Sequence, residues 1–210
     1  MNLPEIKRLI NMCAFEDELF CCGFERIAGA DEVGRGSLAG PIVAAAVIMD
    51  RKKIFIENLN DSKKIPEKNR KKIFRKIIKS CRCWSVAKVP SSIIDRISLG
   101  NANRLVIKKA INGLKMKPDI VMTDAFDINM QKFDIPVIPI INGDELSSSI
   151  AAASVIAKVF RDKIMLKMSR IYPQYDFIHN KGYGTGKHLI SIQRHGPSKI
   201  HRISFKNFSC

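Results

Sequence analysis

The sequence predicts an α/β protein in which helices flank a mixed β-sheet, followed by a small helical segment at the C-terminus. Three observations support this prediction. Short apolar runs, as at 26–33 and 40–49, are typical of buried strands. Longer segments with apolar residues at helical spacing, such as 3–23, alternate with these runs. The order of the elements, strands first and then strands mixed with helices, favours a mixed sheet.

The first half of the chain is expected to open with a helix and then to form an antiparallel pair of strands, because the connection between the two strands is short. A polar loop separates this pair from the next helix. That helix is basic and begins at Pro66, since proline is common at the first helical position. The elements predicted here are a helix at 3–23, strands at 26–33 and 40–49, a helix at 66–81 and a strand at 82–89.

The second half is expected to alternate helices with strands and to end in a tail of short helices and loops. Gly100 favours a break in the first of these helices, and the longest helix carries an alanine-rich face. No internal repeat or linker is visible, so we predict one domain over 1–170 and a C-terminal helical segment over 171–210. The elements predicted here are a helix at 91–115, strands at 119–124 and 135–141, and a helix at 146–170.

The chain is strongly basic. Its 36 Lys and Arg against 20 Asp and Glu give a formal net charge of +16, which favours binding to a polyanion such as nucleic acid. A lysine-rich codon usage would produce the same bias. No apolar run approaches the ~20 residues of a membrane span, and the first residues lack a secretory signal pattern. The six cysteines form no Cys-x-x-Cys pair, which favours free thiols in a reducing compartment. We expect a cytoplasmic monomer without a membrane partner.

Acidic residues stand at the ends of three predicted strands. Asp31 and Glu32 end the first strand, Asp124 ends a later one, and Asp144 follows the last. Strand ends at one sheet edge are where α/β sites assemble. Four carboxylates without Cys or His suit Mg²⁺ or Mn²⁺, and two such ions about 3.5–4 Å apart can promote phosphodiester hydrolysis. Neighbouring strand residues point to opposite faces, so we expect a backbone bend, permitted by Gly34, to bring the first two acids together.

Each acid also has an ordinary structural explanation. The acidic pair could be a solvated turn, the third acid could start a turn, and the fourth could cap the following helix. Two further acids compete for membership of the set. Asp61 could form a local turn with Ser62, and Asp162 could form an ion pair with Lys158, four residues earlier on a helix. The residues alone leave these alternatives open.

The segment 28–36, with 38–41 after it, resembles the signature of the type 2 ribonucleases H, the ribonuclease HII family. The resemblance extends to Lys-Gly-Tyr-Gly-Thr at 181–185 and His-Arg-x-Ser-Phe at 201–205. It implies a ribonuclease H-like sheet in the first domain and a C-terminal segment that completes the substrate site. One departure is Ser37, where the family frequently has proline; this bears on the rigidity of the loop.

The resemblance also implies roles for individual residues. The family's catalytic and metal-binding acids map onto Asp31, Glu32, Asp124 and Asp144, which would hold Mg²⁺ or Mn²⁺ in a two-metal mechanism. The Gly-Arg-Gly loop would recognise a ribose 2′-hydroxyl, which distinguishes RNA from DNA, and the tyrosine would read the RNA–DNA junction. The implied substrate-binding residues are Gly34, Arg35, Gly36, Lys63, Ser154, Lys158, Arg161 and Tyr183.

Simpler explanations remain for these substrate contacts. A tyrosine between glycines suits stacking on a sugar or base, but it also suits a surface turn. Ser154, Lys158 and Arg161 recur at spacings of four and three and share one helix face. Phosphate contact and plain solvent exposure explain the two cations equally well, and the resemblance favours phosphate contact.

We therefore predict an endoribonuclease that hydrolyses the RNA strand of RNA–DNA hybrids. It would also cut on the 5′ side of ribonucleotides embedded in duplex DNA, leaving 5′-phosphate and 3′-hydroxyl ends, and so serve ribonucleotide excision repair. A ribonuclease HIII-like hybrid nuclease is one alternative, although that family usually has an extra N-terminal domain and 27 residues precede Ala28. A non-catalytic basic nucleic-acid-binding module is another, although clustered carboxylates repel phosphates unless metal ions intervene.

Overall fold

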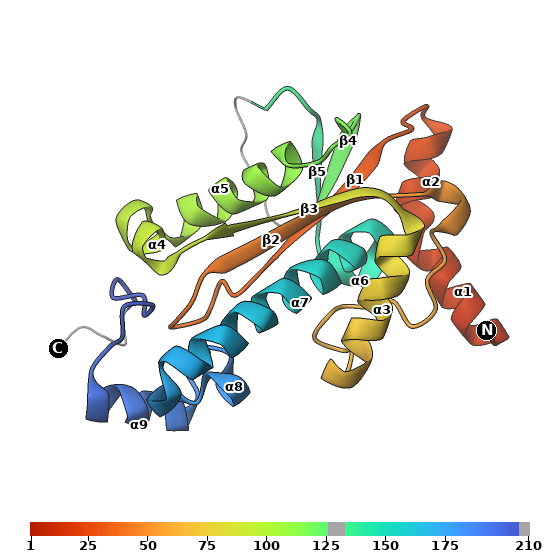
Figure 1. Ribbon diagram of the computed structural model, residues 1–210. Coiled ribbons are helices and arrows are strands. Elements are labelled where there is room, and N and C mark those ends of the chain that lie inside the picture. The colour runs from red at the N-terminus through yellow and green to blue at the C-terminus, as the bar shows by residue number, and fades with distance from the viewer. Residues whose placement is uncertain (126–132, 206–210) are drawn as a thin grey trace.

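In the computed structural model, which describes residues 1–125 and 133–205, five strands form one mixed sheet in the order β3-β2-β1-β4-β5 (Figure 1). β1 is antiparallel to β2, as predicted, and parallel to β4. β3 is antiparallel to β2, and β5 is parallel to β4. The strands are β1 (Ile27–Val33), β2 (Ile42–Met49), β3 (Cys81–Val89), β4 (Ile120–Asp124) and β5 (Val137–Ile140).

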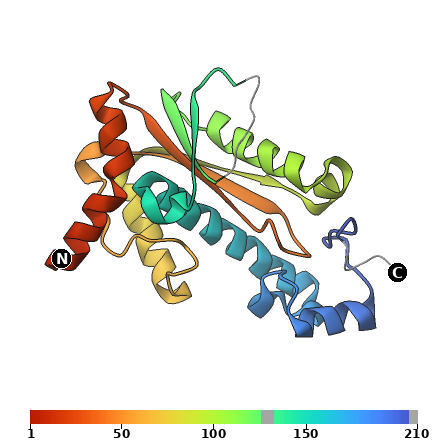
Figure 2. The same ribbon diagram turned by 180° about the vertical axis from the view of Figure 1, so that it is seen from behind.

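Helices cover both faces of this sheet, which confirms the predicted α/β class. α4 and α5 lie on one face, whereas α7 and α3 lie on the other (Figures 1 and 2). α1 and α2 lie near the start of α7, and α8 and α9 lie near its end. The helices are α1 (Leu3–Met12), α2 (Ala14–Cys21), α3 (Glu67–Ser80), α4 (Ser91–Ile97), α5 (Leu99–Asn112), α6 (Gly143–Leu146), α7 (Ser148–Ile171), α8 (Phe177–Asn180) and α9 (Gly186–His195), with 3₁₀ turns at Arg51–Lys53 and Pro173–Tyr175.

Two apolar layers explain why β2 is buried along its whole length. Every residue of this strand is buried, because a strand with helices on both faces has no solvated side. Val47 belongs to the layer that contains Ile77 of α3 and Ile156 of α7. Its neighbour Ile48 belongs to the other layer, together with Ile107 of α5. The strand alternates between the two layers and anchors the sheet in the middle of the molecule.

α7 crosses β1 so closely at Gly29 that a side chain would not fit there. A Cβ atom at Gly29 would lie 2.2 Å from the carbonyl carbon of Ser149 and 2.5 Å from the backbone nitrogen of Ile150. Both atoms belong to the first turn of α7. The three alanines that follow, 151–153, are fully buried. The predicted alanine-rich stretch is therefore the part of α7 that packs closely on the sheet.

Several helix boundaries differ from the prediction. The segment 3–23 forms two helices rather than one, because the chain leaves helical geometry at Cys13. The mid-chain helix breaks at Ser98, whose φ of 75° lies in the left-handed region, and not at Gly100. The longest helix starts after Ser147, whose side chain accepts the N-terminal capping bond, and a separate helical turn precedes it.

The C-terminal segment forms short helices and loops, as predicted. Its buried Tyr175 packs with Met165 of α7 and with Ala39. A backbone bridge pairs Ala39 with His201, so this segment joins the loop that follows β1. Cys210 lies outside the described residues, and the other cysteines are free thiols. None of the helices in the described ranges has the length and apolarity that crossing a membrane requires.

Candidate active site

The four predicted acids lie at one end of the parallel part of the sheet. Asp31 and Glu32 are near the C-terminal end of β1, and Asp124 is the last residue of β4. Because these two strands run parallel, their C-terminal ends meet at the same edge. Asp144 lies in α6, the helical turn that follows β5, which is parallel to β4. The fold therefore brings acids from distant parts of the chain to one edge.

No backbone bend separates the first two acids, so the expectation of a bend is wrong. Asp31 pairs with Ala45 and Glu32 with Ala44 in regular register. Their side chains therefore point to opposite faces of the sheet, Asp31 toward α7 and Glu32 toward α5. The backbone N–H of Glu32 still donates to Asp31 Oδ1 at 2.7 Å. The left-handed turn comes afterwards, at Gly34, whose φ is 90°.

A hydrogen bond connects the other two acids. The backbone N–H of Gly143 donates to Asp124 Oδ1 at 2.8 Å, and Gly143 directly precedes Asp144. The cap positions of the two adjoining helices belong to other residues, Asn142 for α6 and Ser147 for α7. Asp144 is therefore not a helix cap, and the end of β4 is held against the helical turn that carries it.

The carboxylates repel one another in surroundings that contain little water. Asp31 is 6% exposed and Asp144 is 5% exposed. Burial raises the pKa of Asp31 well above its usual range, and the negative charges of Glu32 and the two other acids raise it further. Burial also raises the pKa of Asp144, with the charge of Asp124 as the next cause. Bound cations relieve repulsion of this kind.

Lys63 reaches this acid cluster. Its Nζ lies 3.3 Å from Asp144 Oδ2 and 3.9 Å from Asp61 Oδ1. As the side chains stand in the described residues, no group of three or more Asp, Glu, His or Cys is arranged to hold a metal ion. The donor set nevertheless fits a divalent cation, because it consists of mutually repelling oxygen ligands, one of which already pairs with an ammonium group. Binding an ion would require the carboxylates to close on it.

The two competing acids have the local roles that the alternatives describe. Asp61 Oδ1 accepts the backbone N–H of Lys63 at 2.9 Å, which is a local turn. Asp162 pairs with Lys158 at 2.8 Å, as the spacing predicts, and with Arg70 of α3 at 3.0 Å. The pair with Arg70 joins α7 to α3, and it explains Asp162 without a metal ion.

Replacing Asp162 by Asn is expected to lower the free energy of unfolding by about 2 kcal/mol, because Arg70 and Lys158 lose a partly buried ion-pair partner. The stabilisation by divalent cations should not change, since this acid lies outside the cluster. Denaturant unfolding with and without Mg²⁺ or Mn²⁺ measures both quantities. Loss of the cation effect in Asp162→Asn would place this residue in the metal site instead.

Two buried arginines hold the Gly-Arg-Gly loop. Arg202 donates from Nη2 to the carbonyl oxygen of Gly34 at 2.7 Å and from Nη1 to that of Arg35 at 2.8 Å. A Cβ atom at Gly34 would lie 2.1 Å from Nε of Arg161, and the positive φ there also favours glycine. At Gly36, in contrast, a Cβ atom would have no neighbour within 4 Å. The loop therefore has a fixed inner side and an open outer side.

The three candidate substrate residues on α7 differ in accessibility. Lys158 is partly exposed. Arg161 is fully buried, and its guanidinium donates to the carbonyl oxygen of Pro41 at 3.1 Å and to Ser37 Oγ at 2.8 Å. The predicted phosphate contact of Arg161 does not fit this burial, and its contacts make it a support of the loop after β1. Ser154 is buried as well, next to the first acid.

Tyr183 is exposed beside the same loop. The guanidinium carbon of Arg161 lies 5.3 Å from the centre of its ring. The backbone N–H groups of Leu38 and Ala39 donate to the carbonyl oxygen of Gly182 at 2.8 and 3.1 Å. These bonds tie the tyrosine turn to the segment that follows the Gly-Arg-Gly loop. The fold thus brings together two motifs that are far apart in the sequence.

Two candidates escaped the sequence analysis. Asn103 of α5 is fully buried, and neither polar atom of its amide has a hydrogen-bond partner among the described residues. Its amide lies close enough to Glu32 to oppose the rise in pKa that burial causes, although no hydrogen bond of full geometry forms between them. His188 is fully buried behind Tyr183. A polar residue on the apolar face of a helix is a signal that could have identified Asn103, whereas nothing local marks His188.

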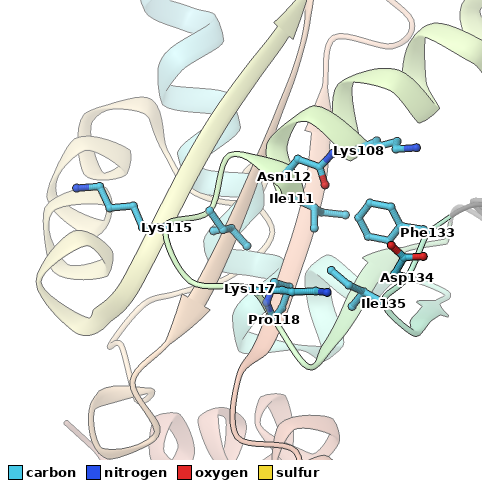
Figure 3. A pocket seen from close by; sticks show the side chains of 10 residues that line it. Lys108, Ile111, Asn112, Lys115, Lys117, Pro118, Phe133, Asp134 and Ile135 are labelled. Carbon is cyan, nitrogen blue, oxygen red and sulfur yellow. The ribbon is translucent and has the colours of Figure 1, made fainter.

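A pocket of 540 Å³ lies away from the acids (Figure 3). It is lined by the last turns of α5 and by residues that precede β4, so it lies near the end of β4 opposite to Asp124. Figure 3 shows the ring of Phe133 beside Ile111, with Lys108 and Lys117 close by. The predicted site residues do not line this pocket, and it belongs to a different surface.

This chain is similar to known proteins both in sequence and in architecture. A sequence model of the family described as Ribonuclease HII matches residues 28–208. The ribonuclease HII of Caldicellulosiruptor bescii is 49% identical over 195 residues, which cover 93% of each chain. The crystal structure of ribonuclease H2 from Pyrococcus horikoshii has a TM-score of 0.73 at 25% identity and covers 88% of this chain and 95% of that one. Bst-RNase HIII, solved in complex with Mn²⁺, has a TM-score of 0.70 at 21% identity, over 87% of this chain and 68% of that one.

The family match spans the four acids, the Gly-Arg-Gly loop and the tyrosine turn. This match and the 49% identity to a ribonuclease HII identify the predicted family, whereas the ribonuclease HIII structure shows a shared fold. The mixed sheet with helices on both faces is the ribonuclease H fold. The chain is a ribonuclease H enzyme, and it belongs to the ribonuclease HII family.

Proposed function

We propose that this enzyme hydrolyses the RNA strand of RNA–DNA hybrids and cuts on the 5′ side of ribonucleotides embedded in duplex DNA, leaving 5′-phosphate and 3′-hydroxyl ends. The observation that carries the proposal is the cluster of mutually repelling carboxylates at one sheet edge. A surface that only binds nucleic acid gains nothing from such a cluster, since the acids repel phosphates. The proposed catalytic residues are Asp31, Glu32, Asp124 and Asp144.

The same four acids are proposed to hold two divalent ions, Mg²⁺ or Mn²⁺, whose chemistry in such sites is to activate a water molecule and to stabilise the leaving oxygen. Oxygen donors without Cys or His suit both ions. The Mn²⁺ complex of Bst-RNase HIII, which shares the fold, is consistent with this choice. Lys63, whose ammonium group lies 3.3 Å from Asp144, and the partly exposed Lys158, which pairs with Asp162, are proposed to neutralise substrate phosphates.

The Gly-Arg-Gly loop is proposed to recognise the ribose 2′-hydroxyl. Its outer side is open at Gly36, where a Cβ atom would have no neighbour within 4 Å. Its inner side is held by Arg202 through the carbonyl groups of Gly34 and Arg35, so the loop is pre-organised. Tyr183, 37% exposed beside this loop, is proposed to contact the adjoining nucleotide at the RNA–DNA junction.

The C-terminal segment is proposed to complete the substrate site of the catalytic domain over 1–170. It supplies Tyr183 and the arginine that fixes the loop, and it packs on the end of α7. Ser154 is proposed to act on substrate through the first acid, next to which it is buried. The free cysteines fit a reducing compartment, and a monomer that acts in the cytoplasm in ribonucleotide excision repair is the corresponding biological proposal.

The decisive experiment offers the purified protein two duplexes of the same sequence, one with a single embedded ribonucleotide and one of DNA alone. With Mg²⁺ or Mn²⁺ we expect cleavage of the first duplex only, on the 5′ side of the ribonucleotide, because the loop selects a 2′-hydroxyl. End-labelled products resolved on a denaturing gel identify the position and the ends of the cut. Equal cleavage of both duplexes would contradict ribose recognition, and cleavage that persists in EDTA would contradict the metal site.

A further inference from the structure

Two buried histidines behind Tyr183 have no part in the function proposed so far. His188 is in the first turn of α9 and is fully buried, and His201 is 2% exposed. Their Nε2 atoms lie 3.1 Å apart, and the rings of Tyr175 and Phe177 surround them. Burial lowers the pKa of both rings, that of His201 to about 4. Both histidines are therefore neutral at pH 7, and each has one ring nitrogen that donates and one that accepts.

The groups at the two ends of the pair determine where the protons lie. The backbone N–H of Ser198 donates to Nδ1 of His201 at 2.8 Å, and the Ser198 hydroxyl lies 2.8 Å from the same nitrogen. Because the backbone N–H can only donate, Nδ1 is the acceptor and the proton of His201 is on Nε2. This Nε2–H donates to Nε2 of His188, which leaves the proton of His188 on Nδ1. That nitrogen lies 2.8 Å from the carbonyl oxygen of Tyr183, which only accepts. Both ends thus require the same arrangement of protons.

The chain of bonds ends on the backbone of the proposed substrate-contacting tyrosine. The carbonyl oxygen of Tyr183 accepts a second bond from the N–H of Thr185 at 2.8 Å, and its own N–H donates to the carbonyl oxygen of Asn180 at 2.9 Å. The backbone is therefore fixed on both sides, and the ring remains exposed. Removing the His188 side chain would remove one of the two hydrogen bonds that the Tyr183 carbonyl oxygen accepts.

The same segment also holds the Gly-Arg-Gly loop. Arg202, which binds the carbonyl groups of that loop, directly follows His201. The backbone N–H of Gly40 donates to the carbonyl oxygen of Ile200 at 2.8 Å, and the N–H of Arg202 donates to that of Leu38 at 2.8 Å. The position of the tyrosine and the position of the loop are thus set from one stretch of backbone.

We propose that His188 and His201 are positioning residues that place Tyr183 for substrate through a directed hydrogen-bond chain from the N–H of Ser198 to the carbonyl oxygen of Tyr183. The effect of this chain on cleavage rests on the proposed function, whereas the arrangement of protons does not. The two parts are therefore tested separately.

The proton arrangement is tested by long-range ¹H–¹⁵N spectra of the histidine-labelled protein at pH 7, with signals assigned through single histidine variants. We expect the Nδ1–H form for His188 and the Nε2–H form for His201. The exposed rings of His179 and His195 serve as internal controls. An Nε2–H form at His188, or a doubly protonated ring at either buried position, would overturn the proposal. Because this measurement uses no substrate, its outcome is independent of whether the enzyme selects ribose.

The effect on cleavage is tested on the duplex with one embedded ribonucleotide. His188→Ala is expected to lower kcat/KM by about 10- to 100-fold, because a misplaced contact residue no longer aligns the substrate. His188→Asn, whose amide can still donate to the carbonyl of Tyr183, should recover part of this loss. His195→Ala, on the same helix but exposed, should leave kcat/KM unchanged.

A double-mutant cycle separates positioning from general support of the fold. In a Tyr183→Ala background, His188→Ala should cause little further loss of kcat/KM, because the contact that it positions is already absent. Equal losses in the presence and absence of the tyrosine side chain would overturn the positioning role. If His188→Ala does not fold, the same cycle with His188→Asn tests the positioning role, and the proton positions in the unsubstituted protein test the hydrogen-bond chain.

Discussion

Replacing Asp31 by Asn is expected to lower the cleavage rate by roughly 10³-fold or more, because this acid is a buried member of the proposed metal-binding set and a neutral amide binds divalent cations poorly. The same change is expected to raise the melting temperature in metal-free buffer. The gain arises because the substitution removes a buried negative charge that Glu32 and the other acids repel. Cleavage assays and thermal unfolding in EDTA measure the two effects.

The pH dependence of stability shows why Asp31→Asn should raise the melting temperature in metal-free buffer. The pKa of Asp31 is higher in the folded protein than in the unfolded chain. Between these two values the folded state binds more protons, so stability falls as the pH rises through that range. At neutral pH the carboxylate is therefore a net cost in the absence of a cation. Asp31→Asn should show a weaker decline of melting temperature with rising pH than the unsubstituted enzyme.

The rise in melting temperature caused by divalent cations can be compared between Asp31→Asn, the unsubstituted enzyme and a control variant. Mg²⁺ or Mn²⁺ should raise the melting temperature of the unsubstituted enzyme, since an ion that binds only the folded state stabilises it. The variant should gain much less. Asp162→Asn, whose acid lies outside the cluster, should keep the full gain. A variant at Asp31 that melts earlier in EDTA, or that gains as much from the cations, would contradict a repelling carboxylate cluster that binds metal.

Replacing Gly29 by Ala is expected to lower the free energy of unfolding by about 3 kcal/mol or more, because the added methyl group overpacks the contact of β1 with α7. It would lie 2.2 Å from the carbonyl carbon of Ser149 and 2.4 Å from its oxygen. These are backbone atoms of a helix and cannot rotate away, so α7 must shift as a whole. Denaturant unfolding measures the loss.

Gly100→Ala is the matched control for Gly29→Ala. A Cβ atom at Gly100 meets nothing within 4 Å, and the residue lies in α5, where alanine is favoured over glycine by roughly 0.5–1 kcal/mol. The control should therefore be neutral or stabilising. If Gly29→Ala unfolded at the same denaturant concentration as the unsubstituted enzyme, α7 would not rest on β1 as closely as the structure describes.

Much of the fold follows from local pattern. The buried run that forms β2 has the length and composition of a strand covered on both faces. The basic helix begins at Glu67, one residue later than predicted, because Pro66 is its N-cap residue and not its first helical residue. Helix breaks were less predictable. Gly100 is a weak helix former and was expected to interrupt the helix predicted at 91–115, yet the break between the two helices falls at Ser98. Gly100 lies in the first turn of α5, and a single glycine there costs only about 1 kcal/mol relative to alanine, which is not enough to end the helix.

For the four acids, too, some features follow from local sequence and others depend on the tertiary structure. Their residue types and their places at strand ends were visible in the sequence, because strand ends and carboxylates are local features. The way in which Asp31 and Glu32 share the site was not visible, since it depends on α7 and α5 lying on opposite faces of β1. Asn103, buried beside Glu32, was missed for the same reason.

By itself, the sequence determined the α/β class, the acids at the strand ends and the motifs of the ribonuclease HII family, because these depend on local periodicity and on residue chemistry. The tertiary structure decided which of these residues are accessible. Lys158 and Arg161 share a helix face, yet one is partly exposed and the other is fully buried. Arg161 is covered by the loop after β1, whose Pro41 lies 120 residues earlier in the chain. Burial depends on what packs from elsewhere, and no local pattern records it.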